Sequence, residues 1–296
     1  MFSTHAPRLT KPLVIILAGV LAVAGLLFAN GQIGSAHAAT TRAVRTDVTT
    51  DASAAPKPKP TIVLVHGAWA DSGSWNQVIS LLQRAGYTVD APPNPLQGLT
   101  TDTGALTDFL KSISGPIVLV GHSYGGEVIT NAADGNSQVK ALVYDDAYLP
   151  AKGENLQDLT TAGSCFHLPS SELSTVFNFV SDPEAPSGTD AYVKPSVFPG
   201  CFANGLPASE AAVLAATQRP LATNAITDPS GTPAWATIPS WDIIGLKDHI
   251  VTPAEQLFMA HRAHAHITEV NAPHLSMISN PGVVASVIIR AARAAG

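Results

Sequence analysis

Charged residues and cysteines are scarce in this sequence. Of its 296 residues only 13% are charged, and acidic residues outnumber basic ones by 22 to 16. A chain without a basic excess is not expected to bind nucleic acid. The two cysteines stand far apart and have no pair of histidines beside them, which argues against a zinc site. Hydrophobic residues, at 46%, suffice for a large core, and the length fits one α/β domain with an insertion.

The N-terminus has the pattern of a secretory signal peptide. Arg8 and Lys11 precede an apolar run over residues 13–29, and Ala36-His37-Ala38 forms a small-residue cleavage site. We therefore expect residues 1–38 to be removed and the mature chain to be secreted, without stable membrane association. An uncleaved membrane anchor is the alternative, although the apolar run is short of the roughly 20 residues of a spanning helix.

Two further expectations concern the segment that follows and the cysteines. Residues 39–60 contain almost no large apolar side chains and end in alternating Pro and Lys, which predicts a flexible linker. In a secreted protein, an even number of cysteines predicts a disulfide, here between Cys165 and Cys201. Two buried thiols are the alternative.

The rest of the chain alternates between apolar runs and helical patterns. A continuous apolar and β-branched run, typical of a strand buried on both faces, occupies residues 61–65, and a short apolar run occupies residues 116–120. Further strands are predicted at residues 87–91, 139–144, 240–244 and 267–270. Strand–helix alternation predicts an α/β fold with a doubly wound, mostly parallel sheet. The alternation is interrupted over residues 147–234, where we expect an inserted, mostly helical cap. The core would then be formed by residues 61–146 and 235–296.

A serine lies in a glycine-rich turn between a predicted strand and a predicted helix. The turn reads Gly121-His122-Ser123-Tyr124-Gly125-Gly126. Strand, tight turn and helix are the context that a G-x-S-x-G match requires. Such a turn strains the serine backbone, and flanking glycines let strand and helix pass closely. The pattern predicts a nucleophile at Ser123; a glycine-rich turn that merely contains serine is the alternative.

A serine nucleophile needs a general base and a third group that orients the base. Asp248 follows the strand at 240–244 and is the predicted acid. Asp145 and Asp146, which follow an earlier strand, are the alternatives, whereas Asp242 lies inside a strand. His274 lies in a loop between the strand at 267–270 and the last helix, and is the predicted base. The other histidines have simpler explanations in packing, helix ends or the cap: His122, His167, His249, His261, His264 and His266.

The same chemistry requires an oxyanion hole and a substrate pocket. Backbone N–H groups must point to where negative charge develops. Tyr124, directly after the nucleophile, and Ala68, in the loop after the first strand, are the expected donors. Trp69 is expected to contact the substrate.

These motifs together resemble the α/β-hydrolase superfamily over roughly residues 61–294. Within it, the chain is similar to the group of plant methyl-ester esterases, hydroxynitrile lyases and their bacterial esterase relatives. The resemblance implies hydrolysis of carboxylic esters through an acyl-enzyme, without a cofactor or a metal. The residues that carry it are Val65-His66-Gly67-Ala68-Trp69, Ser74-Trp75, residues 121–126, Gly245 with Asp248, and His274 with Ser279 and Pro281.

Three positions depart from other branches of the superfamily. Hydroxynitrile lyases of this group carry Lys after the base, where this chain has Leu275; perhydrolase-like relatives usually carry Met after the nucleophile, where it has Tyr124. Branches with an Asp nucleophile are disfavoured by Ser123. We therefore expect an esterase for small to medium uncharged substrates. Amide, lactone or carbon–carbon bond hydrolysis, and a slow hydrolase-like binding protein, are the alternatives.

Overall fold

The computed structural model describes residues 58–296. The predicted signal peptide and nearly all of the predicted linker lie outside the described residues. Residues 58–60 have no regular structure and lead directly into the first strand. Among the described residues, none of the helices combines the length and the apolarity that crossing a membrane requires.

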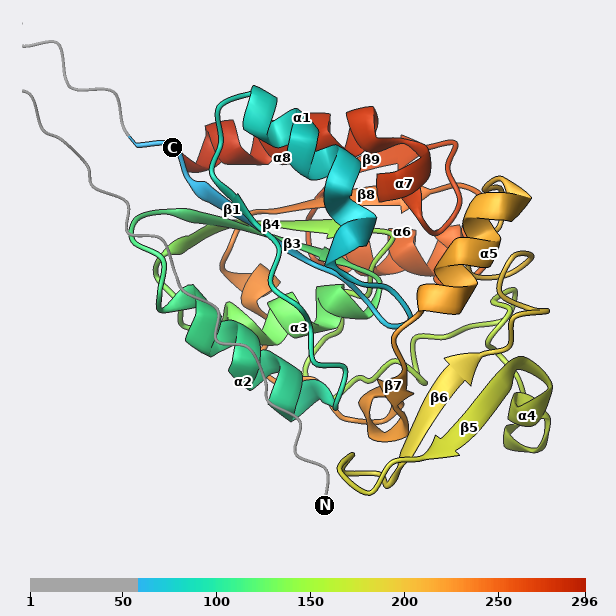
Figure 1. Cartoon of the computed structure of the whole chain (residues 1–296). Coiled ribbons are helices and arrows are strands. Elements are labelled where there is room, and N and C mark those ends of the chain that lie inside the picture. The colour runs from blue at the N-terminus through green and yellow to red at the C-terminus, as the bar shows by residue number, and fades with distance from the viewer. Residues whose placement is uncertain (1–57) are drawn as a thin grey trace, which may run out of the picture. The chain divides into compact units, whose positions relative to one another are not determined.

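A six-stranded, wholly parallel sheet forms the centre of the fold (Figure 1). Its strand order is β2-β1-β3-β4-β8-β9. From β1 the chain first adds β2 at the near edge, and then adds β3, β4, β8 and β9 in turn on the other side. Strands β3 and β8 are buried at every position, as expected for inner strands of a parallel sheet that is covered on both faces. The strands are β1 Thr61–Val65, β2 Val89–Asp90, β3 Ile117–His122, β4 Val139–Asp145, β8 Ser240–Gly245 and β9 His266–Val270.

Helices cover both faces of this sheet, which gives the doubly wound arrangement that the alternation predicts. Helices α1 (Asn76–Arg84) and α8 (Pro281–Ala295) pack together on one face, and α2 (Leu99–Leu110) and α3 (Tyr124–Ala132) on the other (Figure 1). Helix α6 (Pro253–Arg262) connects β8 to β9, and the short α7 (Ser276–Ser279) precedes α8.

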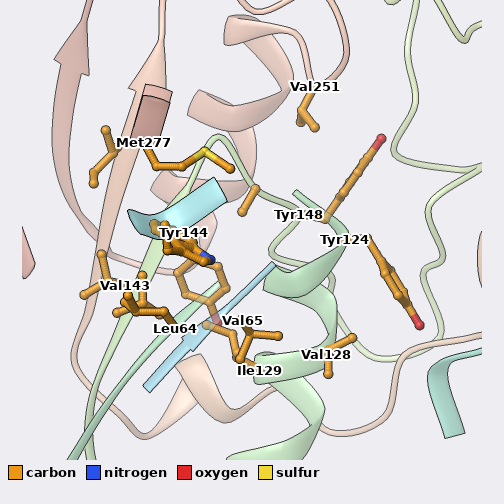
Figure 2. Packing of buried hydrophobic residues seen from close by; sticks show 14 of the residues in the cluster. Leu64, Val65, Tyr124, Val128, Ile129, Val143, Tyr144, Tyr148, Val251 and Met277 are labelled. Carbon is orange, nitrogen blue, oxygen red and sulfur yellow. The ribbon is translucent and has the colours of Figure 1, made fainter. Parts of the chain in front are cut away.

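The main core lies between the sheet and these helices. Figure 2 shows part of it, where Val128 and Ile129 of α3 join Val65 of β1 and Tyr144 of β4 in one apolar cluster. The Tyr144 hydroxyl is satisfied inside this core by Thr130 Oγ1 at 2.9 Å. The core therefore fixes α3, and with it the turn that contains Ser123, against the sheet.

The segment 147–234 differs from the mostly helical cap that we expected. Its longest helix is α5 (Ala208–Thr217), with one turn at α4 (Leu173–Val176). A three-stranded antiparallel sheet accompanies them, formed by β5 (Phe177–Ser181), β6 (Thr189–Val193) and β7 (Leu221–Ala222). Aromatic and β-branched residues dominate β5 and β6 and favour strands, which the search for helical spacing overlooked.

Short 3₁₀ helices complete the described elements, at Ser72–Trp75, Ser170–Glu172, Thr223–Ile226 and Ala234–Ala236. The structure joins Cys165 and Cys201 in a disulfide, with 6.0 Å between their Cα atoms.

Candidate active site

The strand register brings the predicted site residues to one edge of the parallel sheet. Val65 at the end of β1 pairs with Gly121, and His122 at the end of β3 pairs with Asp145 at the end of β4. The loops that follow β1, β3 and β4 therefore start side by side, and the loop after β8 lies next to them. In open α/β sheets, ligands bind at this carboxyl edge.

Ser123 occupies the strained turn between β3 and α3. Its φ of 53° and ψ of −126° lie in a region that non-glycine residues rarely adopt. A Cβ on Gly121 would lie 2.5 Å from the carbonyl oxygen of Gly125, so strand and helix approach at a distance that glycine permits. The turn places Ser123 in a cavity wall at the N-terminus of α3.

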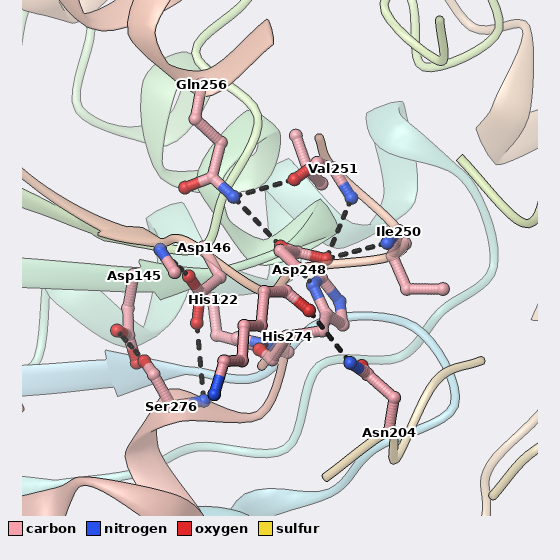
Figure 3. A network of polar contacts seen from close by, with 12 residues as sticks. His122, Asp145, Asp146, Asn204, Asp248, Ile250, Val251, Gln256, His274 and Ser276 are labelled. Atoms are coloured by element: carbon pink, nitrogen blue, oxygen red, sulfur yellow. Dashed lines mark hydrogen bonds and ion pairs between the residues drawn. The ribbon is translucent and has the colours of Figure 1, made fainter. Parts of the chain in front are cut away.

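Asp248 and His274 meet in a hydrogen bond of 2.8 Å between Oδ2 and Nδ1 (Figure 3). Both side chains are fully buried. In this bond Nδ1–H donates to the carboxylate, and Nε2 is the ring nitrogen that Asp248 does not contact. Among residues 58–296, Nε2 has no hydrogen-bond partner, and so no bond joins it to Ser123 Oγ here. Contacts of this kind are often long without substrate and tighten when it binds.

Three further donors hold the Asp248 carboxylate. The backbone N–H groups of Ile250 and Val251 donate to Oδ1 at 2.6 and 3.2 Å, and Gln256 Nε2 donates to Oδ2 at 2.9 Å (Figure 3). No sequence pattern predicted the contact of Gln256. This residue lies on the buried side of α6, eight positions after Asp248, and no local motif indicates such a contact.

His122 supports the other side of the base. Its Nε2–H donates to the backbone carbonyl of His274 at 2.9 Å, and the two ring centroids lie 4.7 Å apart. Burial lowers the pKa of His122 well below its usual value, so the ring is neutral. The residue directly before Ser123 thus contacts the loop of the predicted base.

The alternative acids, Asp145 and Asp146, bond to other groups. Asp145 Oδ1 accepts from Ser276 Oγ at 2.5 Å, and Asp146 accepts from the N–H groups of Gly245 and Ser276 at 2.6 and 3.3 Å. Burial raises the pKa of Asp145 to about 7 and that of Asp146 well above its usual value. Of the three carboxylates, Asp248 is the one that bonds to His274.

The two expected oxyanion donors lie on adjacent loops. A Cβ on Gly67 would lie 2.8 Å from Ser123 Cβ, so the loop with Ala68 passes directly against the turn that contains Ser123. Within the described part of the chain, the N–H groups of Ala68 and Tyr124 donate to no other group. Such free donors are expected at the first position of a helix, where Tyr124 stands.

His66 fixes the start of this loop. Its Nδ1–H donates to the carbonyl of Gly67 at 2.9 Å, and its Nε2 accepts from the N–H of Asn94 at 3.0 Å. Burial lowers the pKa of His66 to about 4, so the ring keeps this neutral tautomer near neutral pH.

A cavity of about 460 Å³ opens beside Ser123. Ala68, Trp69 and Tyr124 are among the residues that line it. Trp69 is held in place because its Nε1–H donates to the carbonyl of Ala191 in β6 at 2.9 Å. None of the lining residues is Asp, Glu, Lys or Arg. The remaining wall comes mostly from the inserted segment and includes Tyr148, Leu156, Phe166, Leu168, Phe177, Phe179 and Ile226.

Other residues singled out in the sequence have varied positions. His167 lines the cavity, and its Nδ1–H donates to the carbonyl of Thr160 at 2.7 Å. His249 is exposed beside Asp248. Phe198 and Phe202 are buried as packing residues, and Phe202 lies 5.2 Å from the His274 ring. The described residues contain no group of three or more His, Cys, Asp or Glu side chains placed to hold a metal ion.

A parallel sheet with Ser123, Asp248 and His274 in the loops after β3, β8 and β9, at its carboxyl edge, has the arrangement of a hydrolase of the α/β type. The chain belongs to the alpha/beta hydrolase family, whose model matches residues 62–287. It is also similar to the plant methylesterase-like group: Methylesterase 17 of Arabidopsis thaliana is 25% identical over 269 residues, which cover 80% of this chain and 93% of that protein.

Two further similarities support the same class. A carbendazim hydrolyzing esterase of Nocardioides sp. (strain SG-4G) is 34% identical over 110 residues, which cover 33% of this chain and 46% of that relative. The structure of an extracellular alpha/beta-hydrolase from a Paenibacillus species superposes with a TM-score of 0.65 at 20% identity, covering 78% of this chain and 98% of the other. The latter shows a shared fold. Together, fold and relatives support a carboxylic ester hydrolase.

Proposed function

We propose that this protein is a secreted serine esterase in which Ser123 is the nucleophile, His274 the general base and Asp248 the residue that orients the base. The observation that carries the proposal is the buried hydrogen bond between Asp248 and His274, with Nε2 left free for a proton, at the sheet edge where the strained turn presents Ser123. Neither part alone defines a nucleophile; together they fit the roles of a catalytic triad.

The mechanism follows from these roles. Nε2 of His274 takes the proton of Ser123 as Oγ attacks the ester carbonyl carbon. The N–H groups of Ala68 and Tyr124 stabilise the oxyanion. When the intermediate collapses, the alcohol leaves with the proton from Nε2 and the acyl group stays on Oγ. Water then attacks in the same manner, gives its proton to Nε2 and releases the acid, with Oγ taking the proton back.

The cavity supports a class of substrate. Its wall is mainly apolar and aromatic, and a charged group placed there would lose its hydration without gaining an opposite charge. Uncharged esters with an apolar acyl or alcohol part therefore fit best. The names of the relatives, a methylesterase and a carbendazim hydrolyzing esterase, agree with small neutral substrates.

The test compares the wild type, Ser123→Ala and Ser286→Ala on short p-nitrophenyl esters. Loss of the nucleophile should lower kcat by several orders of magnitude. Ser286 is exposed on α8, and its substitution should leave kcat unchanged. Equal activity of the wild type and Ser123→Ala would show that Ser123 is not the nucleophile. Inactive wild type that binds these esters stoichiometrically would favour a binding protein instead.

Secretion has a separate test. The disulfide in the structure and the extracellular relative support it. Expressed with its own N-terminus in a secreting bacterium, the protein recovered from the medium should begin at Ala39. A full-length chain retained in the membrane fraction would contradict cleavage.

A further inference from the structure

Each cysteine of the disulfide directly precedes a phenylalanine whose ring packs against Trp69 in the cavity wall. Cys165 directly precedes Phe166, and Cys201 directly precedes Phe202. Both rings contact Trp69, with centroid distances of 5.1 and 5.8 Å. The bond therefore fixes the spacing of two residues that enclose the indole next to Ala68.

The same two segments are hydrogen-bonded to the loop of Asp248. The N–H of Cys165 donates to the carbonyl of His249 at 2.8 Å. From the other side, Nδ2 of Asn204 donates to the carbonyl of Lys247 at 2.8 Å (Figure 3). The backbone carbonyls on either side of Asp248 are thus each bonded to one of the segments that the disulfide joins.

The Cys201 segment also contacts the base. Phe202 is 1% exposed, and its ring lies edge-on to the His274 imidazole at 5.2 Å. The disulfide is therefore adjacent to groups that contact His274 and Trp69. It is also adjacent to groups that bond to the carbonyls of Lys247 and His249, on either side of Asp248.

The Cys165 segment has no regular structure. Between the end of β4 at Asp145 and the 3₁₀ turn at Ser170 the chain forms no helix or strand. Its position therefore depends on individual contacts, among them the hydrogen bond from Cys165 N–H to His249 and the packing of Phe166 against Trp69. The disulfide adds a covalent connection between this segment and the Cys201 segment.

We propose that the Cys165–Cys201 disulfide is a positioning element of the active site: it holds the inserted segment against the loop of Asp248 and the ring of Phe202 against His274. Breaking it should disturb the alignment of acid and base and the shape of the cavity wall, beyond any loss of global stability. The inference rests on the proposed serine esterase function for its kinetic consequence, but its structural consequence is independent of catalysis.

The first measurement is amide hydrogen exchange over residues 246–252. It compares the oxidised wild type, the wild type treated after folding with a water-soluble phosphine, and Cys165→Ser/Cys201→Ser. The phosphine gives two electrons to the disulfide and takes up oxygen from water, leaving two thiols. We expect exchange in this loop to rise at least tenfold on reduction and in the double variant, while β3 and α3 stay protected. Unchanged exchange in the loop would overturn the proposal, whether or not the protein hydrolyses any ester tested.

The second measurement is kcat and KM on a p-nitrophenyl acetate and a p-nitrophenyl benzoate, well below the Tm of each variant. We expect kcat/KM to fall about tenfold for both, since a small misplacement caused far from the reacting atoms can cost up to about 10²-fold. KM should rise more for the benzoate than for the acetate, because the larger acyl group contacts more of the cavity wall. The phosphine should have no further effect on the double serine variant.

Controls separate positioning from stability. Val213→Ser, at a position that is 62% exposed on α5, tests the effect of a serine in the inserted segment and should match the wild type. A lower Tm with unchanged kcat and KM would mean that the disulfide only stabilises the fold, and would overturn the proposal. If the oxidised wild type is inactive on all esters, the proposed function fails, and the exchange measurement alone decides whether the disulfide holds the loop.

Discussion

Asp146 accepts a hydrogen bond of 2.6 Å from the backbone N–H of Gly245 through its Oδ1 (Figure 3). Its other oxygen accepts from the N–H of Ser276 at 3.3 Å. Gly245 begins the loop that contains Asp248, and Ser276 follows His274 by two residues. One carboxylate thus connects both loops whose side chains meet in the Asp248–His274 bond, although it touches neither side chain.

The first prediction concerns Asp146→Asn. Both carboxylate oxygens accept from N–H groups, so an amide NH₂ must face one of these donors and leave it without an acceptor. We expect a loss of about 1–3 kcal/mol in the free energy of unfolding and a fall of about tenfold in kcat/KM as the loops shift. Denaturant unfolding and steady-state kinetics measure both, with the exposed Asp158→Asn as the matched control. Wild-type behaviour of Asp146→Asn in both assays would contradict this role.

The second prediction distinguishes the acid from its alternative. Asp248→Asn should lower kcat on the order of 10⁴-fold, because the amide no longer holds the imidazole in the tautomer with a free Nε2. Asp145→Asn should retain far more activity, since Asp145 bonds to Ser276 Oγ rather than to His274, and burial already raises its pKa to about 7. Measuring kcat of both variants under the same conditions shows which carboxylate orients His274. An equal loss in both variants would show that the two carboxylates share the role.

The fold and the positions of the site loops could be predicted from the sequence, because each depends on a local pattern. A continuous apolar run indicates a buried parallel strand, and the loop that follows such a strand opens at the carboxyl edge of the sheet. Ser123 comes after such a run, and Asp248 and His274 each come in the loop after a later predicted strand. Gly121 predicted the close approach of strand and helix. A Cβ at this position would lie 2.5 Å from the carbonyl oxygen of Gly125.

The contacts that hold the site loops in place could not be predicted from the sequence, because they join residues without a shared local pattern. Asn204 reaches Lys247 across 43 positions and Asp146 reaches Gly245 across 99. Asp146 was considered as an acid because it too follows a strand, and the sequence does not show which loop it bonds. The strands β5 and β6 were overlooked for a different reason, since two short antiparallel strands give little periodicity.

The third prediction concerns pH. Glu127 in α3 is fully buried, and neither oxygen has a partner among the described residues. Burial, with a smaller effect from the charge of Asp228, raises the pKa of Glu127 well above its usual value. The folded state therefore keeps a proton that the unfolded chain releases near its ordinary pKa. Stability should fall as pH rises above about 4.5, by about 1.4 kcal/mol per pH unit from this group until the folded-state pKa is passed.

Glu127→Gln removes this titrating group, so the free energy of unfolding of the variant should increase relative to the wild type as pH rises above about 4.5 toward the folded-state pKa of Glu127. Urea unfolding at several pH values measures the difference. Glu184→Gln, which makes the same change at an exposed position, is the matched control. A difference for Glu127→Gln that stays constant with pH would mean that Glu127 ionises with an ordinary pKa.

The last prediction concerns the contact between the first loop and the nucleophile turn. A methyl group at Gly67 would lie 2.7 Å from the carbonyl oxygen of His122, 2.8 Å from Ser123 Cβ and 3.2 Å from the N–H nitrogen of Tyr124. Backbone atoms account for two of these contacts, so Gly67→Ala must push the loop with Ala68 away from Ser123. The two expected oxyanion donors would then move apart, and one misplaced donor costs about 10²–10³-fold in kcat.

Gly104→Ala is the matched control, because a methyl group there meets nothing within 4 Å and Gly104 lies inside α2. In a helix interior, alanine is favoured over glycine by up to about 1 kcal/mol. We therefore expect Gly104→Ala to keep the wild-type kcat with equal or higher stability, and Gly67→Ala to lose at least about 10²-fold in kcat while still unfolding cooperatively. The added methyl group must move this loop and therefore the N–H of Ala68. A nearly wild-type kcat in Gly67→Ala would then show that the N–H of Ala68 is not an oxyanion donor.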